Sequence, residues 1–179
     1  MANLKKKLSA AVLGLVLAGA PASVILDQFL NEKEGNRLVS YLDSSGIWTI
    51  CRGVIRVDGK AVVKGMRLTA EKCAEVNAIE ERKALAWVAT NIKVPLTEPQ
   101  KAGIASFCPY NIGPGNCFPS TFYKRLNAGD RKGACEAMRW WVHDKGRDCR
   151  LTKGQATGCY GQVERRDQES VLACWGLDQ

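Results

Sequence analysis

The stretch of sequence that decides the fold runs from Glu34 to Thr49 and reads EGNRLVSYLDSSGIWT. A short helix is expected just before it, from about Leu26, because Gly35 is a residue type that commonly ends helices. Asp43 lies nine residues after Glu34, in a turn that enters a β-hairpin, and Thr49 follows on the next strand. We therefore expect a helix end, a turn and a strand to meet where two lobes join.

Two acidic side chains at such a junction suit the hydrolysis of a glycosidic bond. That reaction needs a protonated acid at the leaving oxygen and a second carboxylate that activates water or attacks the sugar. Taken alone, Glu34 beside Glu32 and Lys33 is also typical of a solvated helix surface. Asp43 before a Ser-Ser-Gly turn is also typical of a residue that caps its own backbone, and Thr49 of an ordinary strand hydroxyl.

The segment that follows alternates short apolar runs with turns and then becomes helical. Residues 47–50 and 54–57 are β-like, and Asp58-Gly59 after them is typical of a hairpin. Thr69 is a predicted N-cap of a helix that continues to about Asn91. The apolar face of that helix consists of Cys73, Val76, Ala84, Trp87 and Val88. A helix of this length reaches about 33 Å, which is enough to bridge two lobes.

The rest of the chain is predominantly helical. Thr97 and Gln100 form a predicted capping box at the start of the next helix. Further helices are expected over residues 121–128, 131–143 and 162–174, with an irregular loop between Cys149 and Cys159. The sequence has no internal repeat, low-complexity tract or linker. These features predict one α+β unit, with a small β-containing N-terminal lobe and a larger helical C-terminal lobe.

The N-terminal segment, residues 1–27, indicates whether the chain is exported. A cluster of three lysines at 5–7 precedes nineteen uncharged residues, 8–26, which end at Asp27. That length can span a bilayer, and the lysines would keep the N-terminus in the cytoplasm. The segment is only weakly apolar, since its nine Leu, Val and Ile residues contribute on the order of −4 kcal/mol and glycine, serine and proline oppose them.

Three interpretations of this segment remain open. Residues 1–27 are an uncleaved signal anchor before a domain at 28–179, or a signal peptide cut at Ala20-Pro21-Ala22, or a buried core helix. We favour the anchor, because the apolar stretch exceeds the usual core of a signal peptide, about 7–15 residues. Either targeting interpretation exports the remaining chain.

The charge and the cysteines narrow the classes of partner and site. The chain has a formal net charge of +8, which draws it to anionic surfaces, but no zinc-finger spacing or arginine-rich tract points to nucleic acid. The cysteines lack the C-x-x-C spacing of metal and redox sites, so disulfides are favoured over a metal site or free thiols, with 105 connectivities open. The eight are Cys51, Cys73, Cys108, Cys117, Cys135, Cys149, Cys159 and Cys174.

The spacing Glu34-x8-Asp43-x5-Thr49 resembles that of the phage-type lysozymes, a family of muramidase endolysins. The resemblance covers about residues 30–176 and rests on several ordered motifs. These are Leu96-Thr97, Gln100, Ser106-Phe107, Tyr110-Asn111-Ile112-Gly113, Gly161, Arg165-Arg166 and Glu169. The resemblance implies a lysozyme-like α+β fold with its cleft between the lobes. It also implies hydrolysis of the β-1,4 bonds between N-acetylmuramic acid and N-acetylglucosamine in peptidoglycan, which lyses the host cell for phage release.

The family motif assigns roles to individual residues. Glu34 would be the general acid, held protonated near neutral pH by partial burial. Asp43 would stay ionised and steer the attacking water or stabilise positive charge on the sugar, and Thr49 would position that water. Tyr110 and Thr121 match positions that line the sugar groove. The resemblance implies a monomer that needs no cofactor and no metal.

The N-terminal segment resembles the signal-anchor-release segments of some of these endolysins. Such a segment tethers the enzyme, inactive, to the inner membrane facing the periplasm and later releases it to the periplasm. Some relatives use an anchor cysteine as a thiol switch, whereas residues 1–27 contain no cysteine. We therefore expect that release and refolding of residues 8–33 activate the enzyme.

The sequence departs from the family at two positions. Val54 stands where many relatives have histidine, and Cys51 stands where many have glycine. Within the resemblance we expect Cys51 to be a disulfide partner. The expected pairs are Cys51 with Cys73, Cys108 with Cys117, Cys149 with Cys159, and Cys135 with Cys174.

Other functions are weighed against this one. The main alternative is a disulfide-rich, membrane-anchored binding protein without catalysis. A lytic transglycosylase would need one acidic residue and leave anhydro-sugar ends. His143 is the only histidine, which disfavours a metal-dependent amidase and a triad hydrolase, and its plain interpretation is an exposed helix end. Trp140-Trp141 could stack on sugars, although one ring is expected in the core.

Overall fold

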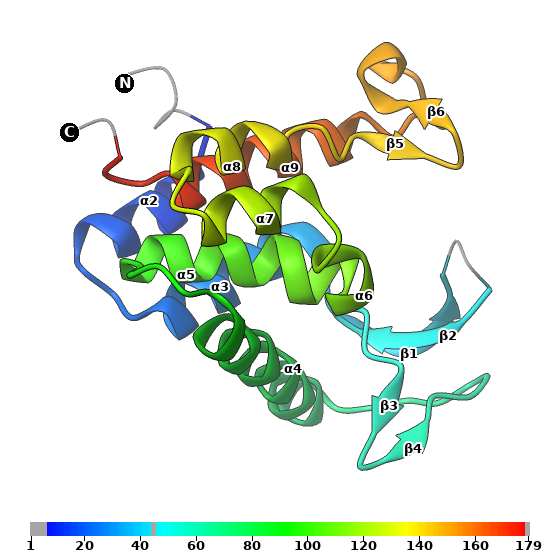
Figure 1. The fold of residues 1–179 in the computed structure, drawn as a ribbon. Helices are drawn as coiled ribbons and strands as arrows, with labels where there is room; N and C mark the ends of the chain where they lie inside the picture. The colour runs from blue at the N-terminus through cyan, green and yellow to red at the C-terminus, as the bar shows by residue number, and fades with distance from the viewer. Residues whose placement is uncertain (1–6, 44–45, 178–179) are drawn as a thin grey trace.

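The computed structural model describes residues 7–43 and 46–177, so Lys5, Lys6 and the Ser44-Ser45 turn lie outside the described residues. A small β lobe follows two N-terminal helices and precedes a larger helical lobe (Figure 1). The elements are α2 (Ala10–Leu17), α3 (Ala22–Glu34), β1 (Arg37–Leu42), β2 (Trp48–Cys51), β3 (Arg56–Val57), β4 (Lys60–Ala61), α4 (Ala70–Asn91), α5 (Glu98–Ala105), the π-helix η1 (Ser106–Ile112), α6 (Pro114–Cys117), α7 (Thr121–Asn127), α8 (Arg131–Met138), β5 (His143–Asp144), β6 (Arg147–Asp148), the 3-10 helix η2 (Cys149–Thr152) and α9 (Tyr160–Ala173). The expected α+β, lysozyme-like fold is confirmed.

Helices α2 and α3 belong to the main hydrophobic core. Ser9 caps α2, and Gly19, with φ of +72°, lies in the break before α3. The α3 helix begins at Ala22 and not near Leu26, because the Ala22 N–H at its first position donates to Glu98 at 2.7 Å. Their buried side chains include Val12, Val16, Ile25, Leu26, Phe29 and Leu30. Of the helices in the described part of the chain, none is both long and apolar enough to cross a membrane.

The β lobe consists of two antiparallel hairpins around a small core of its own. Strands β1 and β2 pair with Tyr41 opposite Thr49, and β3 and β4 flank the predicted Asp58-Gly59 turn. Both turn residues have positive φ, as a two-residue hairpin of this type requires. The core beneath the strands contains Ile50, Cys51, Val54, Val57, Val62, Cys73 and Val76.

Helix α4 connects the two lobes, as its length predicted. Thr69 caps it by accepting a hydrogen bond from the Lys72 N–H at 3.1 Å. Its N-terminal part packs in the β-lobe core through Val76, and its C-terminal part packs in the main core through Ala84 and Val88. The two lobes therefore share one rigid element.

The helical lobe agrees with the sequence except near residue 140. Gln100 Oε1 accepts from the Thr97 N–H at 3.0 Å, which confirms the capping box. The helix expected over 131–143 ends at Met138, because the chain then turns into the β5–β6 hairpin. His143 is therefore an exposed strand residue and not a helix end, so that prediction was wrong.

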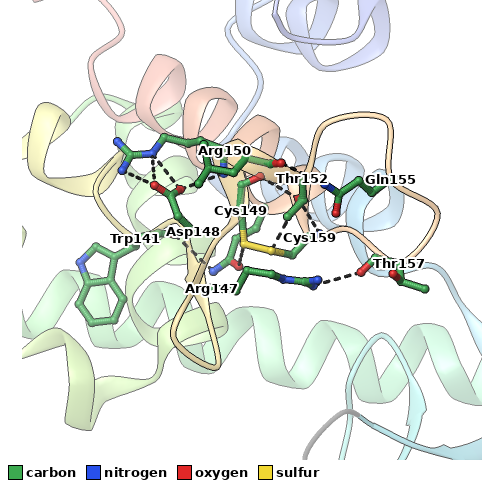
Figure 2. Close-up of a disulfide and its surroundings, with 11 residues drawn as sticks. Trp141, Arg147, Asp148, Cys149, Arg150, Thr152, Gln155, Thr157 and Cys159 are labelled. Atoms are coloured by element: carbon green, nitrogen blue, oxygen red, sulfur yellow. Dashed lines mark hydrogen bonds and ion pairs between the residues drawn. A yellow bond between two sulfur atoms is a disulfide. The ribbon is translucent and has the colours of Figure 1, made fainter.

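Four disulfides link the elements, and they are the four pairs expected from the sequence: Cys51–Cys73, Cys108–Cys117, Cys135–Cys174 and Cys149–Cys159. Cys51 has a φ of +53°, a left-handed conformation that favours glycine. Figure 2 shows Cys149–Cys159 closing the loop beyond the β5–β6 hairpin. Within that loop, Arg147 donates to the Thr157 carbonyl at 3.0 Å.

Candidate active site

Glu34 is the last residue of α3, and its side chain reaches a groove between the lobes. The helix ends there because Gly35 follows with φ of +64°. The Glu34 side chain is 22% exposed, and its Oε1 lies 2.6 Å from Nη1 of Arg165 on α9. The Glu34 carboxyl group is therefore partly buried, as expected. It also forms an ion pair with Arg165 that was not predicted from the sequence.

Arg165 belongs to a buried cluster that fixes α9 against the preceding helices. Its Nε lies 3.0 Å from Oε1 of Glu169, and that oxygen also accepts from the Ser106 hydroxyl at 2.6 Å. Arg166 reaches the other Glu169 oxygen at 3.1 Å and donates to Asn111 at 2.7 Å. Arg165, Arg166 and Glu169, which the sequence marked as one motif, thus form a buried cluster that pairs with Glu34 through Arg165.

Asp43 and Thr49 lie at the end of the first hairpin. Asp43 Oδ1 accepts from the Ile47 N–H at 2.8 Å, so this carboxylate caps the turn that follows it. Thr49 is 2% exposed, and its hydroxyl donates to the Ile47 carbonyl at 3.0 Å. These contacts fix the geometry of the turn that carries Asp43.

Tyr41 links the two acidic residues electrostatically. Burial raises the pKa of its phenol, and the negative charges of Glu34 and Asp43 raise it further, while Arg37 lowers it. Both carboxylates are therefore close enough to influence one side chain on β1. Tyr41 was not predicted as a site residue, because an aromatic residue at this position is typical of any β-strand.

The groove has a volume of about 660 Å³ and takes side chains from both lobes. Its lining consists of Glu34, Arg52, Gly53, Val54, Ile55, Arg56, Glu80, Lys83, Ala84, Trp87, Pro109, Tyr110, Asn111 and Pro114. One wall is the turn after β2, and the opposite wall is formed by α4 and the π-helix η1. This volume lies within the range of ligand-binding pockets, about 300–1,000 Å³.

The residues expected to bind substrate fall in different places. Tyr110 lines the groove, and its hydroxyl donates to the Arg52 carbonyl at 2.7 Å, while burial raises the pKa of its phenol. Thr121 is the exposed first residue of α7 and is not among the described residues that line the groove, so its role stays a prediction. Arg52, Trp87 and Val54 were not predicted as lining residues.

The structure also bears on metals. No group of three or more His, Cys, Asp or Glu side chains within residues 7–43 and 46–177 is placed to hold a metal ion.

A groove between a small β lobe and a helical lobe, with a glutamate at its edge, defines a lysozyme-like glycan hydrolase. Residues 31–169 match the family model for phage lysozyme, and the chain belongs to that family. It is therefore an enzyme, a muramidase whose substrate is peptidoglycan.

Relatives match along nearly the whole chain. The "SAR-endolysin" of Escherichia phage N15 is 77% identical over 179 residues, which cover 100% of both chains. The "SAR-endolysin" of Escherichia phage 933W is 72% identical over 177 residues, which cover 99% of this chain and 98% of the other. Among solved structures, the endolysin from Escherichia coli O157:H7 phage FAHEc1 is 36% identical with a TM-score of 0.69, covering 87% of this chain and 92% of that one. A P22 lysozyme is 30% identical with a TM-score of 0.65, covering 82% and 93%.

Proposed function

We propose that Glu34 is the general acid for cleavage of the β-1,4 bond between N-acetylmuramic acid and N-acetylglucosamine. The observation that carries this assignment is its position at the groove edge, at the end of α3, with its carboxyl group oriented by Arg165. Glu34 gives its proton to the oxygen that leaves the muramic acid carbon. Arg165 acts as a positioning residue, because its guanidinium restricts the carboxyl group to one orientation.

Asp43 and Thr49 complete the proposed catalytic group. Asp43 remains ionised and either steers the attacking water or stabilises the positive charge that develops on the sugar. Thr49 helps to position that water through the turn that carries Asp43, because its buried hydroxyl donates to the Ile47 carbonyl. Tyr110, whose hydroxyl is already committed to the Arg52 carbonyl, offers its ring as part of the groove wall.

The biological role is that of an endolysin, which lyses the host cell and releases phage. Relatives named as SAR-endolysins match this chain from end to end at 70% identity or more. This similarity along the chain supports the proposal that residues 1–27 serve for export. The exported chain therefore acts on the peptidoglycan layer.

Residues 1–27 serve as an anchor that tethers the enzyme to the inner membrane, facing the periplasm, until it is released as a monomer. Retention of this segment is supported by its packing, because Val12 and Val16 of α2 are 0% and 7% exposed. Cleavage at Ala20-Pro21-Ala22 would remove both side chains from the core. We propose that the boundary between residues 27 and 28, which falls inside α3 of the folded chain, separates the anchor from the enzyme while the segment is in the membrane.

The decisive experiment compares Glu34→Gln with wild type in the loss of turbidity of outer-membrane-permeabilised bacteria. We expect a loss of lysis of at least a hundredfold, since the amide cannot donate the proton. Glu32→Gln is the matched control, because Glu32 is an exposed residue of the same helix, and wild-type lysis is expected. Equal lysis by wild type and Glu34→Gln would remove Glu34 as the acid, and anhydro-sugar products in mass spectra would indicate a transglycosylase instead.

A further inference from the structure

Arg52 is a buried cation at the point where the β lobe, α3 and α4 meet. Its residue is 8% exposed, and it directly precedes the Gly53–Arg56 turn that forms one wall of the groove. Its guanidinium Nη1 lies 2.7 Å from Asp27 Oδ1 and 2.9 Å from Glu81 Oε1. A buried guanidinium is unfavourable unless such partners surround it.

The remaining contacts of Arg52 join it to three elements, α3, α4 and η1. Nη1 also donates to the Asp27 carbonyl at 3.3 Å, and Nη2 donates to Asn31 Oδ1 at 3.1 Å. The Arg52 backbone N–H donates to Asn77 Oδ1 at 3.2 Å, and its carbonyl accepts from Tyr110 at 2.7 Å. One residue thus bonds to α3, α4 and η1 at the same time.

The partners on α3 are arranged to fix how that helix is rotated. Asp27 and Asn31 are four residues apart and therefore lie on the same helix face. Glu34 follows Asp27 by seven residues, about two turns or 10 Å along the same helix. Contacts at Asp27 and Asn31 therefore fix the C-terminal end of α3. They also fix the position of the Glu34 carboxyl group relative to the groove.

Glu81 is the partner of Arg52 whose pKa is shifted by burial and by the charges around it. Burial raises the Glu81 pKa to about 7, and the charge of Asp27 also raises it, whereas Arg52 and Arg82 lower it. Asp27 and Glu81 therefore share one guanidinium, with Glu81 buried and Asp27 more than half exposed. Loss of Asp27 from this site changes the balance of charge around Arg52.

We propose that Arg52 is a positioning residue that holds the acid-bearing helix α3 in register with the groove, and that its network closes only when residues 8–34 have packed against the rest of the chain. Asp27 is the first charged residue after the apolar segment 8–26. With that segment in a bilayer, Asp27 and Asn31 lie at the membrane surface and Arg52 keeps only its partners on α4 and η1. The second half of this proposal rests on the anchor proposed above.

The test uses the full-length released enzyme, with kcat and KM measured on soluble glycan strands and normalised to the folded fraction. Arg52→Met is expected to lower kcat at least tenfold with KM changed less than threefold. Arg52→Lys keeps the charge but not the planar fork, so an intermediate kcat is expected. If Arg52→Met does not fold, Asp27→Asn replaces it, with an expected two- to tenfold fall in kcat.

Asp58→Asn is the matched control for Asp27→Asn. Its carboxylate pairs with Lys72 at 2.9 Å and is 62% exposed, against 57% for Asp27, but the pair lies outside the groove. We expect Asp58→Asn to keep kcat within twofold of wild type. An equal fall in both variants, or an unchanged kcat in a folded Arg52→Met, would overturn the positioning role.

Hydrogen exchange provides a measure that does not depend on catalysis. In Arg52→Met, the amides of residues 28–34 are expected to exchange at least tenfold faster, while those of α8 keep their wild-type rates. Glu34→Gln should abolish lysis and leave α3 exchange unchanged, so a failure of the catalytic assignment is separable from a failure of this one. Membrane-anchored protein in vesicles of bacterial phospholipid should exchange at 28–34 as fast as Arg52→Met, and protected amides there would refute the dependence on docking.

Discussion

Gly103→Ala tests how closely α5 and α9 must approach for the groove to work. A Cβ atom at Gly103 would lie 2.7 Å from the Ala173 backbone N and 2.8 Å from the Glu169 carbonyl oxygen. Ordinary contact begins at about 3.4 Å, so α9 must retreat by about 0.7 Å. Overpacking of this kind costs about 1–3 kcal/mol, against which alanine regains up to about 1 kcal/mol of helix preference. With the full gain in helix preference, the net loss of stability is therefore expected to be about 0–2 kcal/mol.

The same shift moves Arg165, which α9 carries, away from Glu34. Because a misplacement near 1 Å can cost about a hundredfold in rate, we expect a ten- to hundredfold fall in kcat. Urea unfolding measures the stability, and hydrolysis of purified peptidoglycan measures the rate. Gly161→Ala is the control, since it lies in α9 with open space around it and should be neutral or stabilising by up to about 1 kcal/mol. If Gly103→Ala matches Gly161→Ala in both measurements, the close approach of the helices has no functional importance.

Two further changes test the core and its charges. Because the Glu81 pKa is raised to about 7 from 4.5, the folded state holds a proton that the unfolded chain releases, so stability falls as pH rises from about 5 to 8, by on the order of 3 kcal/mol. Glu81→Gln should remove this slope, which urea titrations at pH 5, 6.5 and 8 would reveal, and a slope equal to wild type would contradict it. Phe29→Ala should cost about 3–5 kcal/mol, since Phe29 is 1% exposed, whereas Val24→Ala, at a site 44% exposed, should stay within about 0.5 kcal/mol in thermal melts. Similar melting temperatures for both would show that α3 is not part of the stable core.

Features with a local cause were predictable from the sequence. The caps at Thr69 and Thr97, the Asp58-Gly59 turn and the extent of α4 depend on neighbouring residues, and the structure agrees with each. The end of α8 at Met138 was not predictable, because it depends on the pairing of His143 with Asp148 in the following hairpin. Helical periodicity continued across that boundary and gave no sign of the turn.

The supports of the proposed site could not be predicted, for a different reason. Arg52 and Asp27 are 25 residues apart, and Arg165 and Glu34 are 131 residues apart, so no spacing rule relates them. Arg165 was noticed only as part of a family motif, without its partner. Glu34, Asp43 and Thr49 were found because they lie in one short stretch, and their catalytic roles stay predictions.

In the anchor proposed above, the segment that forms α2 and the start of α3 would lie first in the membrane and later in the folded enzyme. Leu17 and Val24 face water with 69% and 44% of their surface exposed, at positions where a helix used only in water would carry lysine or glutamate. A charged side chain at either position would be well solvated in the released enzyme but would disfavour insertion of the segment into a bilayer. If the proposed anchor is correct, lysine or glutamate at Leu17 or Val24 should leave the released enzyme soluble but weaken its retention in the membrane.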